Sequence, residues 1–503
     1  MTAAPMRVEL ADLAATALFA EDVALALKPG DCLCLSGDLG AGKSTFARAL
    51  IRAIADDPEL EAPSPTFTLV QLYQLRLPVA HLDLYRIGSP DELDELGLDD
   101  ALAEGAALIE WPEKALERLP VDRVMMRFDG IGNSRSLTIE ASETFIIRLD
   151  RSRAARKFLE RQFSGAVARR FLQGDASTRS YEIIRSEKRE PVILMNAQRQ
   201  PDGPPVRDGL PYSRIAHLAE DVVPFVAIAR WLRAEGFAAP EILGEDLDQG
   251  FLLVENLGTE GILDKDGKPD PERYEVAIDC LAALHGKDLP GALPAGDRVH
   301  HVPAYDARAM QIEVELLTDW YLPWLRGAAA VADEERARYL ELWQALFAHL
   351  QSAEKSLVLR DYHSPNLIWR DDRSGLDRLG IIDFQDAMIG PLAYDVASLC
   401  QDARVTVDQA LAGRLLDRYV AARLRANPLF DEAGFREAYA IMAAQRAAKI
   451  LGIFVRLKQR DGKSGYLRHL PRIEAYIAAS LAHPVLQPLR FWFTKAGIGE
   501  SES

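Results

Sequence analysis

Residues 37–44, which read GDLGAGKS, have the spacing of a loop that surrounds phosphate groups. They fit the pattern G-x-x-x-x-G-K-S, in which glycines let backbone N–H groups turn toward phosphate oxygens. The start of the following helix adds partial positive charge. In this pattern Lys43 neutralises the β- and γ-phosphates and the Ser44 hydroxyl is a ligand of Mg²⁺. We predict a nucleoside triphosphate site here, with an unrelated glycine-rich turn as the alternative.

Two carboxylates end apolar, strand-like segments and could complete this site. Asp83 lies in the segment HLDLY, and Glu110 ends the segment LIE. If both strands belong to a parallel sheet, their carboxyl ends meet at one edge, near the phosphate loop. Hydrolysis of the nucleotide needs a carboxylate for the metal and a group that positions water. The alternative for each residue alone is a solvated acid at the end of a strand.

A second set of polar residues has the spacing of a kinase catalytic loop. In residues 359–366, Asp361 is followed five positions later by Asn366, and Asp383 ends an apolar strand further on. Transfer of a phosphoryl group to a hydroxyl needs one carboxylate that accepts the proton, and an Asn and a second Asp that hold Mg²⁺. We therefore assign Asp361 as the base, and Asn366 and Asp383 as metal ligands. Two unrelated acidic loops are the alternative.

Three further segments would complete a kinase site, although each could be a plain turn. Residues 252–258 are similar to the hinge whose backbone binds adenine, which would involve Glu255 and Leu257. Asp395 follows the metal-binding Asp and would brace the catalytic loop. Residues 172–181 would lie over the phosphates, although they lack a three-glycine pattern.

The elements around these residues indicate two α/β units. Residues 10–27 and 44–55 have the apolar spacing of helices, and strand-like segments occur at 32–36, 67–73, 79–85, 107–111 and 136–141. Strands interleaved with helices favour a mainly parallel sheet. A second unit begins near residue 160 with strands, and the chain is mostly helical after about residue 272.

Composition limits the possible functions. The 503 residues carry a net charge of -17, and residues 1–150 hold 13 basic and 26 acidic side chains. Such a chain is not expected to hold nucleic acid against a basic surface. Four cysteines are too few for a disulfide framework, and we see neither a secretory signal nor an apolar run long enough for a membrane span. We expect a reduced, cytoplasmic protein.

The first unit resembles the TsaE family, the small ATPase of the bacterial machinery that makes threonylcarbamoyl-adenosine in tRNA. The segments GDLGAGKSTF, SPTFTLV, HLDLYR and IEWPE carry the resemblance, in this order. It implies that Ser44 and Glu110 hold Mg²⁺, that Asp83 supports catalysis, and that Thr66 lies in a switch-like loop. The ATP contacts that it implies are Thr16, Gly37, Leu39, Gly40, Ala41, Gly42, Lys43, Ser44, Thr45 and Arg135.

The second unit resembles aminoglycoside-phosphotransferase-like kinases, and within them the AmgK branch. The segments GDASTRSYEI, RDYHSPNL, IDFQDA and QRAAKILGIFVRL carry this resemblance. It implies a kinase that phosphorylates the anomeric hydroxyl of N-acetylmuramate and N-acetylglucosamine in cell-wall recycling. Met195 stands where most such kinases carry a phosphate-binding lysine, and Leu359 where a histidine is usual. Arg446 and Lys449 could bind a substrate carboxylate or form a solvated helix face.

Together these observations predict a fusion that uses ATP and Mg²⁺ at two sites. We expect a P-loop ATPase domain at 1–148, a linker at 149–164 and a two-lobed kinase-like domain at 165–503, with its small lobe at about 165–257. The implied partners are TsaB- and TsaD-like subunits, an amino sugar, and tRNA only indirectly. Alternatives for the kinase half are another small alcohol, an aminoglycoside, or a pseudokinase scaffold.

Overall fold

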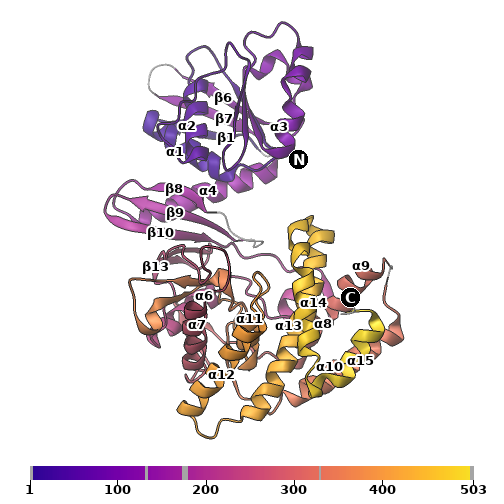
Figure 1. Cartoon of the computed structure of the whole chain (residues 1–503). Helices are drawn as coiled ribbons and strands as arrows, with labels where there is room; N and C mark the ends of the chain where they lie inside the picture. The colour runs from indigo at the N-terminus through magenta and orange to yellow at the C-terminus, as the bar shows by residue number, and fades with distance from the viewer. Residues whose placement is uncertain (1–3, 131–133, 173–178, 328–329, 499–503) are drawn as a thin grey trace. The chain divides into compact units, whose positions relative to one another are not determined.

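The computed structural model describes residues 4–130, 134–172, 179–327 and 330–498. The chain divides into two compact units, Met1–Asn196 and Ala197–Ser503 (Figure 1). The two units are described separately below.

The first unit contains a seven-stranded sheet with the order β1-β7-β6-β2-β5-β4-β3. Strands β6, β2, β5 and β4 are parallel, whereas β1, β7 and β3 are antiparallel to their neighbours. Strands β2, β4 and β5 are almost completely buried, as expected for parallel strands covered on both faces. The strands are β1 (Met6–Leu10), β2 (Cys32–Ser36), β3 (Val70–Tyr73), β4 (Val79–Asp83), β5 (Ala106–Glu110), β6 (Val124–Asp129) and β7 (Arg135–Glu140).

Helices cover both faces of this sheet, which gives three layers. One apolar core joins alternate strand residues such as Leu33 and Leu108 to helices α1 (Leu13–Ala26), α2 (Lys43–Ala55) and α4 (Glu143–Gln162). The other joins Cys34 and Ile109 to the 3-10 helix Pro90–Leu96 and α3 (Leu98–Glu104). The predicted mainly parallel α/β domain is confirmed.

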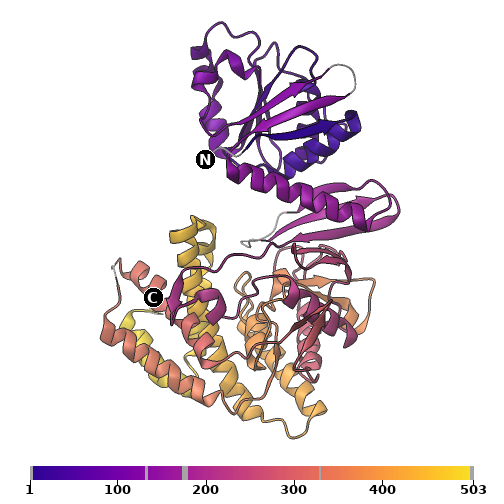
Figure 2. The same cartoon turned by 180° about the vertical axis from the view of Figure 1, so that it is seen from behind.

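Helix α4 occupies most of the predicted linker. It is one continuous helix, begins after Ser142, whose hydroxyl accepts the N–H of Phe145, and leads toward strands β8 (Ala168–Leu172), β9 (Ser180–Ser186) and β10 (Arg189–Asn196) (Figure 2). These three strands form an antiparallel meander. The division into compact units falls after β10. The domain bounds expected from the sequence, with a linker at 149–164, stay a prediction.

The second unit is mainly helical, and its short strand pairs carry the polar loops of interest. The loop with Asp361 lies between β17 (Lys355–Val358) and β18 (Leu367–Trp369), and Asp383 follows β19 (Leu379–Ile381). The other strands are β11 (Pro205–Arg207), β12 (Leu210–Pro211), β13 (Ile242–Asp246), β14 (Phe251–Val254), β15 (Leu293–Ala295), β16 (Arg298–His300) and β20 (Met388–Pro391). The helices are α5 (Tyr212–Ile215), α6 (Val223–Ala234), α7 (Pro271–Leu284), α8 (Ala307–Leu316), α9 (Leu322–Arg326), α10 (Asp333–His349), α11 (Ala393–Cys400), α12 (Gln409–Ala426), α13 (Glu432–Asp461), α14 (Leu470–Ser480) and α15 (Gln487–Ala496).

Helix α13 is the central element of this unit. It packs against α8, α11 and α14. In the part of the chain that the structure describes, it alone is long and apolar enough to cross a membrane, but 89% of its apolar window is buried inside the protein. That burial is typical of the core helix of a folded domain.

Candidate active sites

The phosphate loop between β2 and α2 has a backbone that requires glycine at two positions. Gly37 and Gly42 have φ angles of 136° and 108°, in the region that side chains rarely adopt. A Cβ atom at Gly37 would lie 2.4 Å from the carbonyl oxygen of Phe128. Because α2 begins at Lys43, its N-terminal N–H groups open on this loop.

Lys43 and Ser44 point toward neighbouring groups of the same site. The Lys43 ammonium donates to the carbonyl oxygens of Gly37 (2.7 Å) and Asp38 (3.0 Å) and lies 3.7 Å from the centre of the Trp111 ring. Burial lowers the pKa of Lys43, although nearby carboxylates oppose that shift. The Ser44 hydroxyl donates to Oε2 of Glu110 at 2.7 Å.

The two predicted carboxylates lie side by side at the sheet edge. Asp83 and Glu110 are register partners in the parallel strands β4 and β5. Glu110 Oε1 is 3.0 Å from Nε2 of His81, a buried residue that the sequence analysis did not assign. Asp83 Oδ2 accepts the hydroxyls of Ser64 (2.8 Å) and Thr66 (2.6 Å), so the expected switch residue Thr66 contacts the expected catalytic carboxylate.

These side chains line a cavity of about 380 Å³. A hydroxyl and two carboxylates are the hard oxygen donors that suit Mg²⁺, so Ser44 and Glu110 fit a magnesium site. Thr16 is not among the lining residues, because its hydroxyl donates to the carbonyl of Asp12 (2.9 Å). Gly37 and Ala41 shape the loop without lining the cavity. The lining residues are Leu39, Gly40, Gly42, Lys43, Ser44, Thr45, Ser64, Thr66, Asp83, Tyr85, Glu110, Trp111 and Arg135.

In the second unit, the predicted catalytic and metal-binding residues come together. Asn366 Nδ2 donates to the backbone carbonyl of Asp361 (2.9 Å) and lies 3.4 Å from Oδ2 of Asp383. Gln385 donates to the other oxygen of Asp383 at 2.8 Å. The Asn366 amide and the Asp383 carboxylate therefore lie close to one another, and amide and carboxylate oxygens are the donor types that fit Mg²⁺.

Asp395 on α11 holds the catalytic loop through its backbone. Its two carboxylate oxygens accept the N–H groups of Leu359 (2.6 Å) and Arg360 (2.9 Å). The pKa of Asp395 is raised to about 7, mainly by burial; the two backbone N–H groups oppose this shift and the Asp361 charge adds to it. Because the contact at Leu359 uses its backbone, the loop is braced without a histidine side chain at this position.

Glu313, which was not predicted from the sequence, anchors Arg360, the residue directly before Asp361. Glu313 on α8 is fully buried, and it pairs with Arg360 and with Lys449 (2.9 Å). Tyr305 (2.5 Å) and Gln445 (2.9 Å) also donate to it. Although burial opposes ionisation, Lys449 and Arg360 hold the pKa of Glu313 at about 2.

This network decides the role of Lys449, for which the sequence left two alternatives open. Lys449 is buried and paired with Glu313, so it is neither a solvated residue nor a free substrate ligand. Arg446 is also buried and donates to the carbonyl of Gln401 (3.1 Å). Helix α8 gave no sequence signal because its two glutamates, Glu313 and Glu315, have no diagnostic spacing.

The remaining predicted nucleotide contacts are less defined. Glu255 follows β14, and its carboxylate accepts Arg233 (3.1 Å), while Leu257 is buried. The expected phosphate-covering segment includes residues 173–178, which lie outside the described residues. Met195 is buried in β10, so this position offers no cationic partner for phosphate.

Folds and sites together define a P-loop nucleotide-binding domain joined to a kinase-like phosphotransferase. Residues 10–137 match the family model "Threonylcarbamoyl adenosine biosynthesis protein TsaE", and residues 168–437 match "Phosphotransferase enzyme family". The chain belongs to the phosphotransferase family and, through its N-terminal part, to the TsaE family. Both resemblances seen in the sequence are confirmed.

Individual relatives agree with this division. The N-acetylmuramate/N-acetylglucosamine kinase of Caulobacter vibrioides is 36% identical over 360 residues, which are 69% of this chain and 96% of that protein. The tRNA threonylcarbamoyladenosine biosynthesis protein TsaE of Rickettsia bellii is 38% identical over 120 residues, which are 24% of this chain and 83% of that protein. The structure of aminoglycoside 2'-phosphotransferase-IIIa aligns with 64% of this chain and 98% of its own at 16% identity, with a TM-score of 0.42.

Proposed function

We propose that this protein is bifunctional. Its N-terminal domain serves as the ATPase of tRNA threonylcarbamoyladenosine synthesis, and its C-terminal domain is an ATP-dependent kinase that makes sugar 1-phosphate from N-acetylmuramate or N-acetylglucosamine. The observation that carries the kinase proposal is the position of Asn366, which lies 3.4 Å from the Asp383 carboxylate and donates to the backbone carbonyl of Asp361. The 36% identical kinase from Caulobacter, matched over 96% of its length, supports this choice of substrate.

Each of the kinase residues has a separate role in the proposed reaction. Asp361 accepts the proton of the anomeric hydroxyl, whose acidity makes a strong base unnecessary. Asn366 and Asp383 would hold Mg²⁺, which neutralises charge on the transferred phosphoryl group. Asp395 fixes the backbone that carries Asp361, and Glu313 fixes Arg360 beside it.

In the N-terminal domain, the phosphate loop would bind the ATP phosphates and Lys43 would neutralise them. Ser44 and Glu110 would hold Mg²⁺, and Asp83 would position the attacking water. TsaB- and TsaD-like subunits are the proposed partners, with tRNA contacted through them because residues 1–150 are strongly acidic. Tight, salt-sensitive tRNA binding by the protein alone would contradict this. Both activities consume ATP, which supports a cytoplasmic location.

The test of the kinase proposal is phosphate transfer from labelled ATP to a panel of acceptors. The panel contains N-acetylmuramate, N-acetylglucosamine, choline and an aminoglycoside, and NMR identifies the phosphorylated position. We expect 1-phosphates of the two amino sugars. Transfer only to choline or the aminoglycoside would replace the substrate, and no transfer to any acceptor would indicate a pseudokinase.

A further inference from the structure

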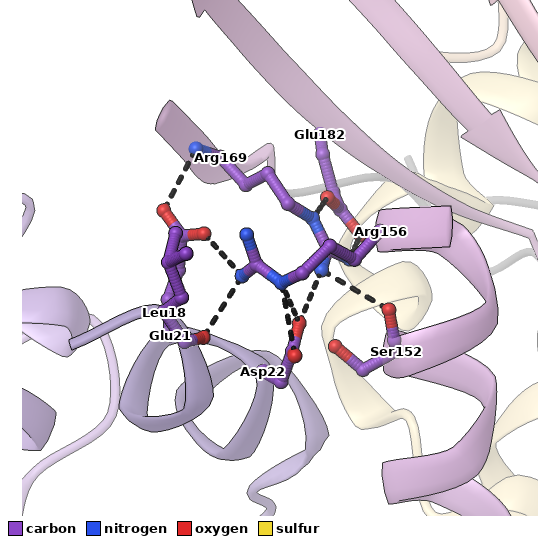
Figure 3. A network of polar contacts seen from close by, with 7 residues as sticks. All are labelled: Leu18, Glu21, Asp22, Ser152, Arg156, Arg169 and Glu182. Atoms are coloured by element: carbon purple, nitrogen blue, oxygen red, sulfur yellow. Dashed lines mark hydrogen bonds and ion pairs between the residues drawn. The ribbon is translucent and has the colours of Figure 1, made fainter. Parts of the chain in front are cut away.

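A buried cluster of charged side chains joins helix α1 to strands β8 and β9 (Figure 3). Its centre is Arg169 on β8, whose side chain is 0% exposed. The Arg169 guanidinium donates to both oxygens of Glu182 on β9 (2.7 and 2.9 Å) and to Asp22 on α1 (2.7 Å). It also donates to the backbone carbonyl of Ser152 on α4 at 3.1 Å.

A second arginine completes the cluster from α4. Arg156 Nε lies 2.9 Å from both oxygens of Asp22, and its NH2 group donates to Glu21 at 2.6 Å and to the carbonyl of Leu18 at 2.9 Å. The other oxygen of Glu21 accepts the backbone N–H of Arg169 at 2.9 Å. Two arginines thus satisfy three carboxylates that come from α1 and β9.

The rim of this contact is exposed. Arg170, the next residue on β8, lies 2.9 Å from Asp56 at the end of α2, and their side chains are 47% and 31% exposed. Arg76 lies over the ring of Phe171 at 5.0 Å. Exposed ion pairs of this kind contribute little to stability, whereas a buried pair leaves an uncompensated charge when one partner is removed.

The cluster connects the two regions that match different families. Asp22 lies within residues 10–137 and Arg169 and Glu182 within residues 168–437, yet their charges are buried together. We infer that the face of α1 and α4 is a fixed docking surface whose partner is the chain's own β8–β9 sheet. The ATPase-type domain and strands β8 and β9 therefore form one folding unit, and this contact is a rigid joint within the first unit instead of a flexible tether.

Two other observations agree with a joint. Helix α4 buries Phe145, Leu149, Phe158 and Leu159 along its length, which a solvated connector would not do. Arg151, also on α4, donates from Nε to the side chain of Asn196 at the end of β10 (2.8 Å).

Hydrogen exchange on the full-length protein tests the inference. In Arg169→Met, Glu182 loses the guanidinium that pairs with it and Asp22 keeps only Arg156, so amides of β8, β9 and α1 should exchange at least a hundredfold faster. Arg170→Met is the matched control, because it removes an exposed pair from the same strand, and its exchange should stay within threefold of the wild type. Unchanged exchange in Arg169→Met, or equal effects of both variants, would overturn the inference.

A second variant covers the case in which Arg169→Met does not fold. Asp22→Asn removes one carboxylate charge from α1 and leaves both arginines in place. We expect at least tenfold faster exchange in α1 and in β8 together, whereas a change confined to α1 would refute the joint. Hydrogen exchange does not depend on catalytic activity. The inference can therefore fail while the proposed function holds, and the proposed function can fail while the inference holds.

Discussion

The two nucleotide sites of this chain are built in different ways. The phosphate loop is one stretch of eight residues, and backbone groups and three glycines with positive φ determine its shape. The kinase loop is held by carboxylates on separate helices, Asp395 and Glu313. The kinase site also includes the non-glycine residues Arg360, in this loop, and Asp383, after β19, at φ angles of 72° and 60°. Such strained backbone persists only where surrounding contacts enforce it. The first site is therefore a local motif, and the second depends on a buried ionic network.

The largest expected effect is on the chemical step of the kinase. Asp361→Asn removes the proton acceptor and should lower the rate of sugar phosphorylation by about a hundredfold to ten-thousandfold. The measurement is the rate of phosphate transfer from ATP at saturating sugar. ATP hydrolysis that depends on Lys43 serves as the internal control, and a loss smaller than tenfold would show that this loop is misassigned.

The next effect concerns the phosphate loop. Lys43→Ala removes the cation that faces the phosphates and should weaken ATP binding at the N-terminal site by about a hundredfold, or roughly 3 kcal/mol. Sugar phosphorylation should stay within twofold of the wild type. Nucleotide titrations and kinase assays on the same preparation measure both, and loss of both activities would contradict separate sites.

The buried network of the kinase should be sensitive to a single charge. Glu313→Gln leaves Arg360 and Lys449 buried without a carboxylate, which should cost about 3–5 kcal/mol of unfolding free energy. Denaturant unfolding measures this loss. Glu341→Gln, which alters an exposed pair with Arg338, is the control and should change stability by less than about 1 kcal/mol. Equal losses in the two variants would mean that the network does not hold the loop.

The smallest expected effect is a dependence of stability on pH. Burial raises the pKa of Asp395 to about 7, so the native state keeps a proton that the unfolded chain releases near pH 4. The stability contributed by this proton is therefore lost as pH rises from about 4 to about 7, and the loss between about pH 5.5 and 7 is roughly 2 kcal/mol.

Asp395→Asn should abolish this dependence, because it cannot titrate. The measurement is the difference in unfolding free energy between the wild type and the variant at the two pH values. A difference that does not change with pH would show that Asp395 is already ionised at about pH 5.5.

Elements formed by one continuous stretch of sequence were predicted better than contacts between residues that are far apart in the sequence. The predicted strand at 107–111 and helix at 44–55 lie within one residue of β5 and α2, because apolar runs next to glycines have clear boundaries. Strands β1 and β6 were not predicted, since charged residues such as Arg7, Glu9 and Arg127 interrupt their apolar residues, and β1 lies at the edge of the sheet. Thr16 was assigned by resemblance, but its hydroxyl bonds to its own helix.

Residues that act at a distance were the hardest to predict. Glu313 and Lys449 are separated by more than a hundred residues, and only the packing of α8 against α13 brings them together. The same holds for Asp22 on α1 and Arg169 on β8, which are also far apart in the sequence and form an ion pair. Charged residues in a helical pattern suggest a solvated face, and burial overrides that interpretation only when the fold is known.

The most direct test of two separate ATP sites is a count of bound nucleotide. Equilibrium binding of a non-hydrolysable ATP analogue with Mg²⁺ should give two bound molecules per wild-type chain. The Lys43→Ala variant and the Asp383→Asn variant should each bind one molecule per chain. A single molecule per wild-type chain, or the loss of both in either variant, would contradict the account.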